Sequence, residues 1–333
     1  MSFSRNLVAG AAILLATGLG AGAETTAPVL GKTYRIGFSQ IVDHPALNAT
    51  RQGFLDGLKA AGFIEGKNLT FEYQNAQGDV GNARNIATKF VADGVDLLAP
   101  CTTPNTQATI RVARGGPIPV VFGCVTNPVE VGVLTSLDKP TGTNITGLYG
   151  AQPVTELLDL LQEVLPKAKT IGTIYNGGET NSIAANAIAK AAAEKRGLRW
   201  VEVQITGSAE VKTAVESLVG RIDALFTPQD NTLASAFDAV VKVTRDNRIP
   251  LFSLDTTSVG RGALAAFGVD QYKSGVAWAS QVAVPVLLGR DPASFLPVAY
   301  KTYDLYLNSA TATADGLTIP PSVLQRVKQT FDK

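Results

Sequence analysis

Histidine and cysteine are almost absent from this sequence, and the spacings typical of catalytic motifs are absent too. The 333 residues include 1 His and 2 Cys, so a His-rich metal site is excluded. Neither the G-x-S-x-G nucleophile turn nor the P-loop spacing occurs after the first 23 residues. Acidic pairs such as Asp230 with Asp255 could do acid/base work, but no spacing singles them out. The sequence therefore predicts no catalytic residue, no metal and no cofactor.

An excess of charge of either sign is also missing. The chain has 29 Lys and Arg against 28 Asp and Glu, and no basic stripe that would indicate a nucleic-acid partner. Long apolar runs are confined to the N-terminus, because no later segment approaches the roughly 20 uninterrupted apolar residues that a membrane span needs.

Residues 1–23 have the pattern of a cleavable export signal. Arg5 is followed by a stretch from Leu7 to Leu19 that is apolar but broken by small residues, and Ala21 to Ala23 form a small-residue cleavage site. An uncleaved N-terminal anchor is the alternative interpretation. No cysteine precedes Cys101, so a lipid anchor would lack its attachment residue. We therefore expect the mature chain in the periplasm, and its length of about 310 residues predicts two domains.

Cys101 and Cys124 are the two cysteines, and each lies near the end of an apolar run. In an oxidising compartment two such residues can pair, provided that their Cα atoms lie about 4.4 to 6.8 Å apart. Neighbouring strands could satisfy that distance, although their register could also forbid it. Two small buried hydrophobic side chains are the alternative.

Strand and helix patterns alternate along the chain. The runs 34–40, 69–76, 95–100 and 118–124 have the pattern of strands. Helical periodicity begins at Pro45 and ends at Gly62, and it recurs over 82–93 and over 106–113. After 144–150 the alternation restarts, with strands expected at 169–176, 199–205, 222–228, 249–254 and 263–270. Helices are expected at 154–165, 183–196, 209–218, 233–245 and 272–288, and 303–307 is expected to be a return segment. Such alternation predicts an α/β fold of two doubly wound parallel-sheet lobes, with helices on both faces of each sheet and the chain crossing between lobes more than once.

Polar side chains follow nearly every expected strand. In open parallel sheets ligands bind outside the carboxyl ends of the strands, so these residues are the candidates for a cleft between the lobes. Each one could instead be only a helix cap. The ligand-binding candidates are Ser39, Gln40, His44, Thr102, Thr103, Gln107, Thr126, Asn127, Glu179, Asn181, Ser182, Asp230, Asn231, Asp255 and Thr256; Asp43, Asn105, Gln229, Thr257 and Asp270 share the same edges.

The residue types favour an amino-acid-like ligand. Helix N-termini near Thr103 and Asn181 suit a carboxylate, whereas Glu179, Asp230, Asp255 and Asp270 could meet an amine. Nearby aromatic and apolar residues could wall a side-chain pocket or simply pack in the cores: Phe38, Phe122, Tyr149, Tyr175 and Phe226.

Several segments resemble one protein family. They include HPALNATRQGFLDGLKAAGFIEGKNLTFEYQNAQGD from residue 44, TTPNTQA from 102, VVFGCVTNPVEVG from 120, GTNITGL from 142, IGTIYNGGETNS from 171, DALFTPQDNT from 223, FSLDTTSVGRGALAAFGVDQYKSG from 252 and GLTIPPSVLQR from 316. Together these resemble the ABC-transporter substrate-binding proteins of the tryptophan/tyrosine-binding type, over residues 34–326.

The resemblance implies a type I periplasmic-binding-protein fold with a hinge and a central cleft, the chain crossing between lobes three times. Expected bounds are 31–148 plus about 270–297 for the N-terminal lobe, and 149–269 plus about 298–333 for the C-terminal lobe. It also implies a monomer that captures an aromatic amino acid by cleft closure and delivers it to an inner-membrane ABC permease. A sensor for another small carboxylate-bearing solute, reporting to a membrane receptor, is the alternative, and an exported enzyme is a third.

The resemblance places ligand loops at 40–44, 103–107, 126–127, 179–182, 230–231 and 255–256. Three positions depart from the family pattern. Relatives often have a small or apolar residue where Cys101 stands, Ala where Asn105 stands and Asp where Asn127 stands. The missing carboxylate at Asn127 bears on how an ammonium group would be held.

Overall fold

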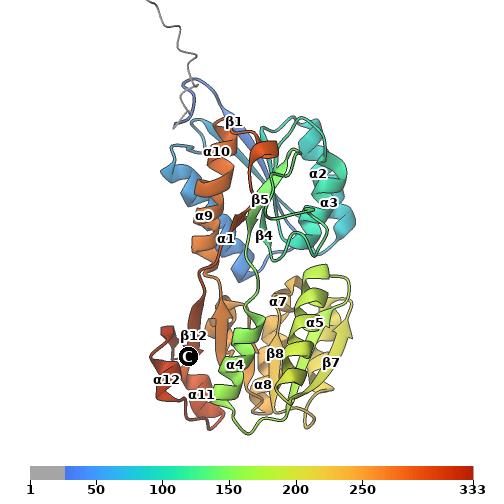
Figure 1. Cartoon of the computed structure of the whole chain (residues 1–333), viewed down its shortest axis with the longest axis vertical. Helices are drawn as coiled ribbons and strands as arrows, with labels where there is room; N and C mark the ends of the chain where they lie inside the picture. Colours follow the sequence, from blue (N-terminus) through green and yellow to red (C-terminus); the bar gives the residue numbers. More distant parts are fainter. Residues whose placement is uncertain (1–26, 333) are drawn as a thin grey trace, which may run out of the picture.

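The computed structural model describes residues 27–332, so the predicted leader at 1–23 lies outside the described residues. The described chain forms two lobes stacked along the long axis of the molecule (Figure 1). Each lobe is built on one sheet, and we call the lobe of the six-stranded sheet the N-lobe and that of the seven-stranded sheet the C-lobe. Within residues 27–332, no helix is long and apolar enough to cross a membrane.

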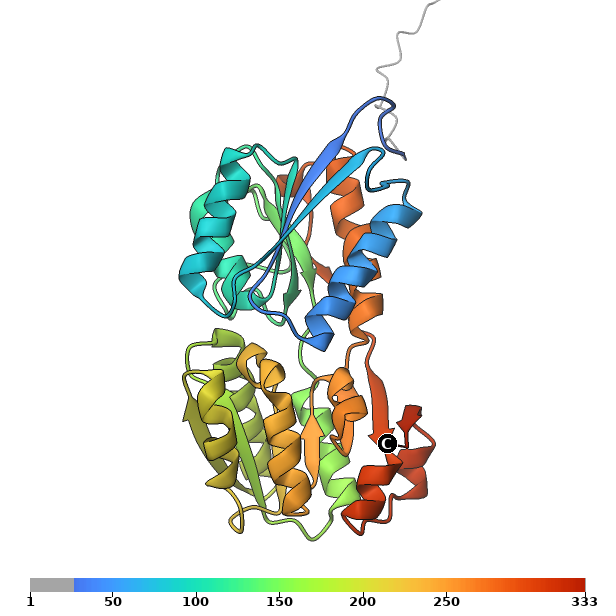
Figure 2. The same cartoon turned by 180° about the vertical axis from the view of Figure 1, so that it is seen from behind.

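The N-lobe sheet is parallel throughout, in the order β11-β5-β4-β3-β1-β2. Helices α1, α9 and α10 cover one face and α2 and α3 the other (Figure 2). The strands are β1 Tyr34–Gln40, β2 Leu69–Asn75, β3 Leu97–Cys101, β4 Val120–Val125, β5 Ile145–Tyr149 and β11 Val298–Ala299. The helices are α1 Pro45–Ala60, α2 Val80–Ala92, α3 Thr103–Ala113, α9 Gln271–Trp278, the π-helical η3 Ala279–Ala283, α10 Val284–Leu287 and η4 Pro292–Ser294.

The C-lobe sheet has the order β13-β12-β10-β9-β8-β6-β7, and β12 runs antiparallel to β10. The strands are β6 Thr170–Asn176, β7 Arg199–Ile205, β8 Ala224–Thr227, β9 Leu251–Ser253, β10 Ala265–Gly268, β12 Asp304–Asn308 and β13 Val327–Phe331. The helices are α4 Val154–Val164, α5 Thr180–Lys195, η1 Ser208–Glu210, α6 Val211–Glu216, α7 Asn231–Ser235, α8 Phe237–Asp246, η2 Thr256–Arg261, α11 Ser309–Ala314 and α12 Pro321–Leu324. Helices α4 and α5 pack on one face, and α6 and α8 on the other.

Three expectations from the sequence need correction. The helix expected over 233–245 is two helices, because the backbone at Ala236 leaves the helical conformation between α7 and α8. The helix expected over 272–288 contains a five-residue π-helical stretch, η3. The return segment at 303–307 is a true strand, β12, whose antiparallel pairing with β10 makes the C-lobe sheet mixed.

Both lobes repeat one strand order, which decides where a ligand can bind. The run β2-β1-β3-β4-β5 in the N-lobe matches β7-β6-β8-β9-β10 in the C-lobe. In each run the second strand along the chain pairs on one side of the first, and the third strand pairs on its other side. The strand order therefore reverses between β1 and β3, and again between β6 and β8, which makes each of these places a switch point. Crevices for ligands form outside the carboxyl ends of the strands at such points.

The chain passes between the two sheets three times, after β5, after β10 and after β11. The first and third passages lie side by side. Tyr300 donates its backbone N–H to the Tyr149 carbonyl at 2.7 Å, and the Tyr303 hydroxyl donates to the Ala151 carbonyl at 3.0 Å. The lobes are therefore connected by a group of adjoining segments.

Candidate functional site

A pocket lies between the two lobes, at the carboxyl ends of the strands that flank both switch points. Its walls come from both lobes in nearly equal share. The N-lobe supplies His44, Ala46, Leu47, Thr102, Thr103, Cys124, Val125, Thr126, Leu148, Gly150, Gln271 and Ser274, and the C-lobe and its connection supply Asn181, Thr227, Pro228, Gln229, Asp230, Asn231, Leu233, Ala234, Phe237, Ser253, Asp255 and Val269.

On the N-lobe side, two helices begin at the pocket without a side-chain cap. His44 precedes α1 and Thr102 precedes α3, and neither side chain accepts a hydrogen bond from its own helix. A proline follows at the first or second position of each helix, where its missing N–H is tolerated. Helix starts of this kind favour negative charge, because unpaired N–H groups and the helix dipole point out of them.

Three buried polar atoms beside these helix starts have no hydrogen-bond partner among the described residues. They are His44 Nδ1 and the hydroxyl oxygens of Thr102 and Thr103, and all three residues line the pocket. Buried polar groups in native proteins are nearly always paired, with protein, water or ligand. These atoms are therefore available to a polar ligand.

On the C-lobe side, two carboxylates hold the start of α7. Glu179 accepts from the backbone N–H groups of Asn231 and Thr232, at 3.1 Å each, and from both of their side chains. Asp230 accepts from the N–H of Leu233 at 2.9 Å and from that of Asn176 at 2.7 Å. The two acids thus tie the end of β6 to the start of α7.

Asn181 and Asp255 complete the C-lobe wall. Asn181 donates through Nδ2 to the Gln229 carbonyl at 3.0 Å, whereas its Oδ1 has no partner among the described residues. Asp255 accepts from the backbone N–H and the hydroxyl of Thr257, at 2.9 and 2.8 Å, and caps η2. Both residues therefore face the pocket from positions fixed by local hydrogen bonds.

The electrostatics of the site are dominated by burial. Desolvation, assisted by the neighbouring charge of Glu179, raises the pKa of Asp230 to about 7. Desolvation lowers the pKa of His44 below its usual value, and the charges of Asp255 and Glu179 only partly oppose this. The imidazole is therefore neutral at neutral pH, and Asp230 keeps its proton to a much higher pH than an exposed carboxyl does.

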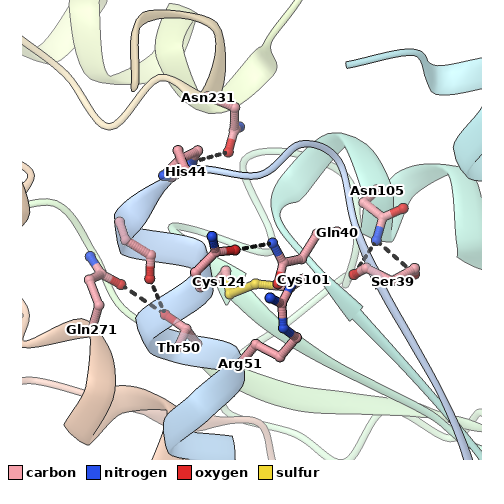
Figure 3. The surroundings of a disulfide bond; sticks show 12 residues. Ser39, Gln40, His44, Thr50, Arg51, Cys101, Asn105, Cys124, Asn231 and Gln271 are labelled. Carbon is pink, nitrogen blue, oxygen red and sulfur yellow. Dashed lines mark hydrogen bonds between the residues drawn. A yellow bond between two sulfur atoms is a disulfide. The ribbon is translucent and has the colours of Figure 1, made fainter. Parts of the chain in front are cut away.

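Among residues 27–332, two hydrogen bonds cross from lobe to lobe. His44 Nε2 lies 3.5 Å from Asn231 Oδ1, and Gln107 Nε2 donates to the Thr180 hydroxyl at 3.2 Å (Figure 3 shows the first pair). The edges of the two lobes are thus in contact around the pocket.

Comparison with known proteins identifies the family of this chain. The family described as ABC transporter substrate binding protein matches residues 35–331. The chain belongs to this family.

One relative of this substrate-binding protein is named for its ligand. This chain is 37% identical to a curated "Tyrosine-binding protein" from Clostridioides difficile over 283 residues, which cover 85% of this chain and 81% of the relative. The fold predicted from the sequence, two doubly wound lobes of the type I class, is confirmed.

Two solved structures are similar to this chain in sequence and fold. One, from Streptococcus pneumoniae, is an ABC domain in complex with L-Trp, with a TM-score of 0.86 at 30% identity over 90% of this chain and 100% of that one. The other is the ligand-free, open structure of a substrate binding protein with adhesive properties from Clostridium difficile, with a TM-score of 0.67 at 36% identity and the same coverage.

Eight of the fifteen predicted ligand residues of this substrate-binding protein line one pocket, and seven do not. His44, Thr102, Thr103, Thr126, Asn181, Asp230, Asn231 and Asp255 line the pocket. The other seven do not line it, namely Ser39, Gln40, Gln107, Asn127, Glu179, Ser182 and Thr256.

Most residues of the second group have local structural partners. The Gln40 side chain bonds with Arg51 at 2.8 Å and Asp43 at 3.2 Å, and Ser39 accepts from Asn105 through its carbonyl and hydroxyl (Figure 3). Asn127 accepts from the N–H groups of Val129 and Glu130 in a turn, and Thr256 donates to the Val269 carbonyl. Asn105 and Asn127, two of the departures from the family pattern, therefore make contacts within the N-lobe.

Sequence reasoning missed several pocket residues. Gln271 and Ser274 lie in the first turns of α9, a helix far along the chain that returns to the N-lobe. Phe237 begins α8 after the unexpected break at Ala236. Of the aromatic candidates, Phe38, Phe122 and Phe226 are core residues, and Tyr149 and Tyr175 do not line the pocket either. The sequence offers one signal for a separate short helix here, namely Asp230, whose position three residues before Leu233 is typical of a residue that caps a helix start.

The two cysteines form a disulfide, which settles the alternative left open by the sequence. Cys101 and Cys124 are joined with their Cα atoms 5.1 Å apart. The bond links Cys101 at the end of β3, two residues before α3 begins, to Cys124 in β4 (Figure 3).

Proposed function

We propose that this substrate-binding protein captures an aromatic amino acid in the periplasm, by closure of its lobes, and delivers it to an ABC permease. One observation carries the ligand proposal. Residues that carry unpaired buried polar atoms line the pocket at two helix starts of the N-lobe, and acidic residues line it from the C-lobe. A ligand with an anionic and a cationic end fits this division of charge.

The ligand carboxylate belongs at the N-lobe edge. There the hydroxyls of Thr102 and Thr103 can donate to an anion, and the uncapped start of α3 favours negative charge. Hydrogen bonds to an ionised group are about twice as strong as neutral ones, so this edge can anchor the ligand.

The ligand ammonium belongs at the C-lobe edge, near Asp230 and Asp255. Asn127 cannot take that role, because it is engaged in its turn and does not line the pocket. A cation beside Asp230 would offset the repulsion from Glu179 and favour the ionised carboxylate. Binding should therefore be linked to proton release from Asp230 near neutral pH.

The ligand side chain has an apolar wall to pack against. Leu47, Val125, Leu148, Val269 and Phe237 line the pocket, and none of them offers a side-chain hydrogen-bond partner. The relatives named for tyrosine and solved with L-Trp support an aromatic side chain here.

Closure supplies the mechanism, and it requires no bond to be made or broken. A ligand that contacts both lobes shifts the equilibrium toward the closed state by its differential affinity. We place the hinge at the three passages near residues 150–153, 269–270 and 300–303, so that β11 Val298–Ala299, which pairs with β5, belongs to the N-lobe and not to the C-terminal lobe as expected from the sequence.

A ligand panel tests the proposal by thermal shift and calorimetry. L-Trp, L-Tyr and L-Phe are compared with tryptamine, which lacks the carboxylate, and indole-3-propionate, which lacks the ammonium. We expect at least one intact amino acid to stabilise the protein, by about 2.7 kcal/mol at a hundredfold excess over its Kd, and both truncated analogues to bind far more weakly. Stabilisation by sugars or aromatic acids instead would overturn the amino-acid proposal.

A matched pair of variants tests the anion site. Thr103 and Thr106 are buried threonines of α3 whose hydroxyls both lack partners among the described residues, but only Thr103 lines the pocket. Thr103→Val should weaken binding about tenfold or more, through loss of a hydrogen bond to a charged group. Thr106→Val should leave affinity unchanged, and equal effects would argue against the assignment.

A further inference from the structure

The Cys101–Cys124 disulfide lies in the wall of the pocket. Cys101 is fully buried and is followed directly by Thr102, whereas Cys124 is only partly buried and lines the pocket itself. The bond therefore joins a pocket-lining residue of β4 to the residue before the start of α3. Figure 3 shows it behind the first turns of α1.

Strand β4 is irregular where it carries Cys124. Phe122 pairs with Gly147 and Val125 with Tyr149, so β4 has one residue more than β5 in this interval. Gly123 lies against the Trp278 ring, whose atoms are 2.4 Å from the site of a Cβ, so only glycine fits there. Cys124 then takes a φ of +57°, and this turns the extra residue to the pocket.

Thr102, on the other side of the bridge, has an even rarer backbone conformation. Its φ of +91° and ψ of +154° lie in a region that is essentially restricted to glycine. Conformations of this kind persist only where the surrounding structure enforces them. Thr102 donates its N–H to the Gly123 carbonyl at 3.2 Å, so the disulfide and this hydrogen bond tie the two unusual residues together.

We propose that the disulfide is a working part of the ligand site, which holds Thr102 and Cys124 in their binding conformations and thereby sets ligand affinity. The inference rests on the proposed function, since it takes the pocket to be the amino-acid site. Without the bond, both backbones can relax to ordinary negative φ, and the fraction of molecules competent to bind falls. The apparent Kd rises in proportion.

The coupling works in both directions. Cys101 is enclosed in the core, so a reducing agent reaches the bond through Cys124 and the pocket. A bound ligand covers that route and also favours the oxidised form. Reduction by dithiothreitol delivers two electrons, breaks the S–S bond to give two protein thiols, and converts the reagent to its cyclic disulfide.

The first test compares two disulfide-free variants by calorimetry with the best amino acid of the panel. Cys101→Ala with Cys124→Ala should bind about tenfold more weakly than the oxidised protein, because alanine rarely takes positive φ. Cys101→Ala with Cys124→Gly should lose less affinity, since glycine takes positive φ readily. Wild-type affinity in the alanine variant would overturn the proposal. If that variant does not fold, oxidised wild type reduced after folding provides the same comparison.

The second test measures the rate at which dithiothreitol reduces the native protein, by counting thiols over time. Saturating ligand should slow reduction at least about tenfold. The control is sucrose at a concentration that raises Tm by the same amount as the ligand, because sucrose stabilises without occupying the pocket. Equal protection by sucrose would overturn the access route. Failure of the oxidised protein to bind any amino acid would overturn the proposed function, whereas equal affinity before and after reduction would overturn this inference alone.

Discussion

At the residue scale, the acidic side chains show how closely capping and binding are connected. The carboxylate oxygens of Glu179 accept hydrogen bonds from the start of α7, and Glu179 does not line the pocket. Asp230 and Asp255 each cap a helix and also line the pocket. Capping and ligand contact therefore coexist in one carboxylate. Replacing Asp230 by alanine would damage the fold along with the site, so a variant that keeps the shape is more informative.

Asp230→Asn should change how stability depends on pH. Burial raises the pKa of Asp230 to about 7, so between its unfolded value and 7 the folded chain holds a proton that the unfolded chain has released. The stabilisation from this group is complete below the unfolded pKa and is lost as pH rises through about 7. Asparagine does not titrate. Stability of the wild type relative to Asp230→Asn should therefore decline from pH 5 to pH 7.5.

Melting of the ligand-free proteins across this pH range checks the expectation. His44 has a lowered pKa and loses its stabilising neutral form as pH falls, but it is present in both proteins and cancels in the difference. Asp79→Asn makes the same exchange at an exposed cap of α2 and serves as reference. A constant or growing advantage of the wild type with rising pH would contradict the raised pKa.

The sequence could predict the part of the site that follows the strands directly. His44, Thr102 and Asp230 lie where a parallel strand hands over to a helix, and the position of that edge is a general property of the fold. It could not predict the direction of each side chain. The Gln40 side chain bonds with Arg51 instead of lining the pocket, and Gln271 lines the pocket although it lies more than 200 residues after Gln40 in the sequence. Local spacing in the sequence indicates neither contact.

At the scale of elements, the contact between α1 and α9 depends on glycine. A Cβ added at Gly53 would lie 2.0 Å from the Tyr272 carbonyl oxygen, and one at Gly275 would lie 2.1 Å from that of Thr50. The two helices therefore approach backbone to backbone. This contact attaches α9, and with it Gln271 and Ser274, to α1, the helix that follows His44.

Gly53→Ala should lower stability, although helix propensity alone predicts the opposite. Alanine is favoured over glycine in a helix by about 1 kcal/mol, but here the added methyl overlaps a backbone carbonyl and forces the helices apart, which costs typically 1–3 kcal/mol and occasionally more. We expect a net loss of about 1 kcal/mol and a lower Tm. Gly207→Ala, where a Cβ meets nothing within 4 Å, is the control. A higher Tm for Gly53→Ala would show that the helices separate easily.

Long periodic elements were predictable, and interruptions were not. The expected bounds of the helices now known as α2, α4 and α5 lie within a few residues of the observed ones. The break at Ala236 and the π-helical stretch of η3 follow from tertiary packing, which leaves no mark on hydrophobic period. The antiparallel pairing of β12 with β10 could not be predicted either, because the direction of a strand depends on the path of the connection before it and not on its own residues.

At the scale of the whole molecule, this structure is more similar to a relative solved with a ligand than to a relative solved in a ligand-free, open state. The L-Trp complex from Streptococcus pneumoniae matches better than the ligand-free, open structure from Clostridium difficile, although its sequence is the less similar of the two. Sequence divergence cannot explain that order. The cross-lobe bonds of His44 and Gln107 agree with a closed arrangement.

Small-angle scattering should detect the transition in solution. Without ligand we expect a radius of gyration larger than that of this structure, because the open state lacks these cross-lobe bonds. Addition of the tightest-binding amino acid should reduce it to the value calculated from the present coordinates, whereas tryptamine should not. An identical radius with and without the amino acid would contradict closure upon binding.

The N-lobe is made from two stretches of the chain that lie far apart in the sequence, and this determines when it can fold. Trp278, from α9, packs against Phe38 and Phe54, with ring centroids 5.4 and 4.4 Å apart. During synthesis the first 150 residues emerge with this core open, because its largest side chain is still to be made. The half of the protein that is translated first is therefore completed late, and the growing chain stays unfinished until nearly all of it has left the ribosome.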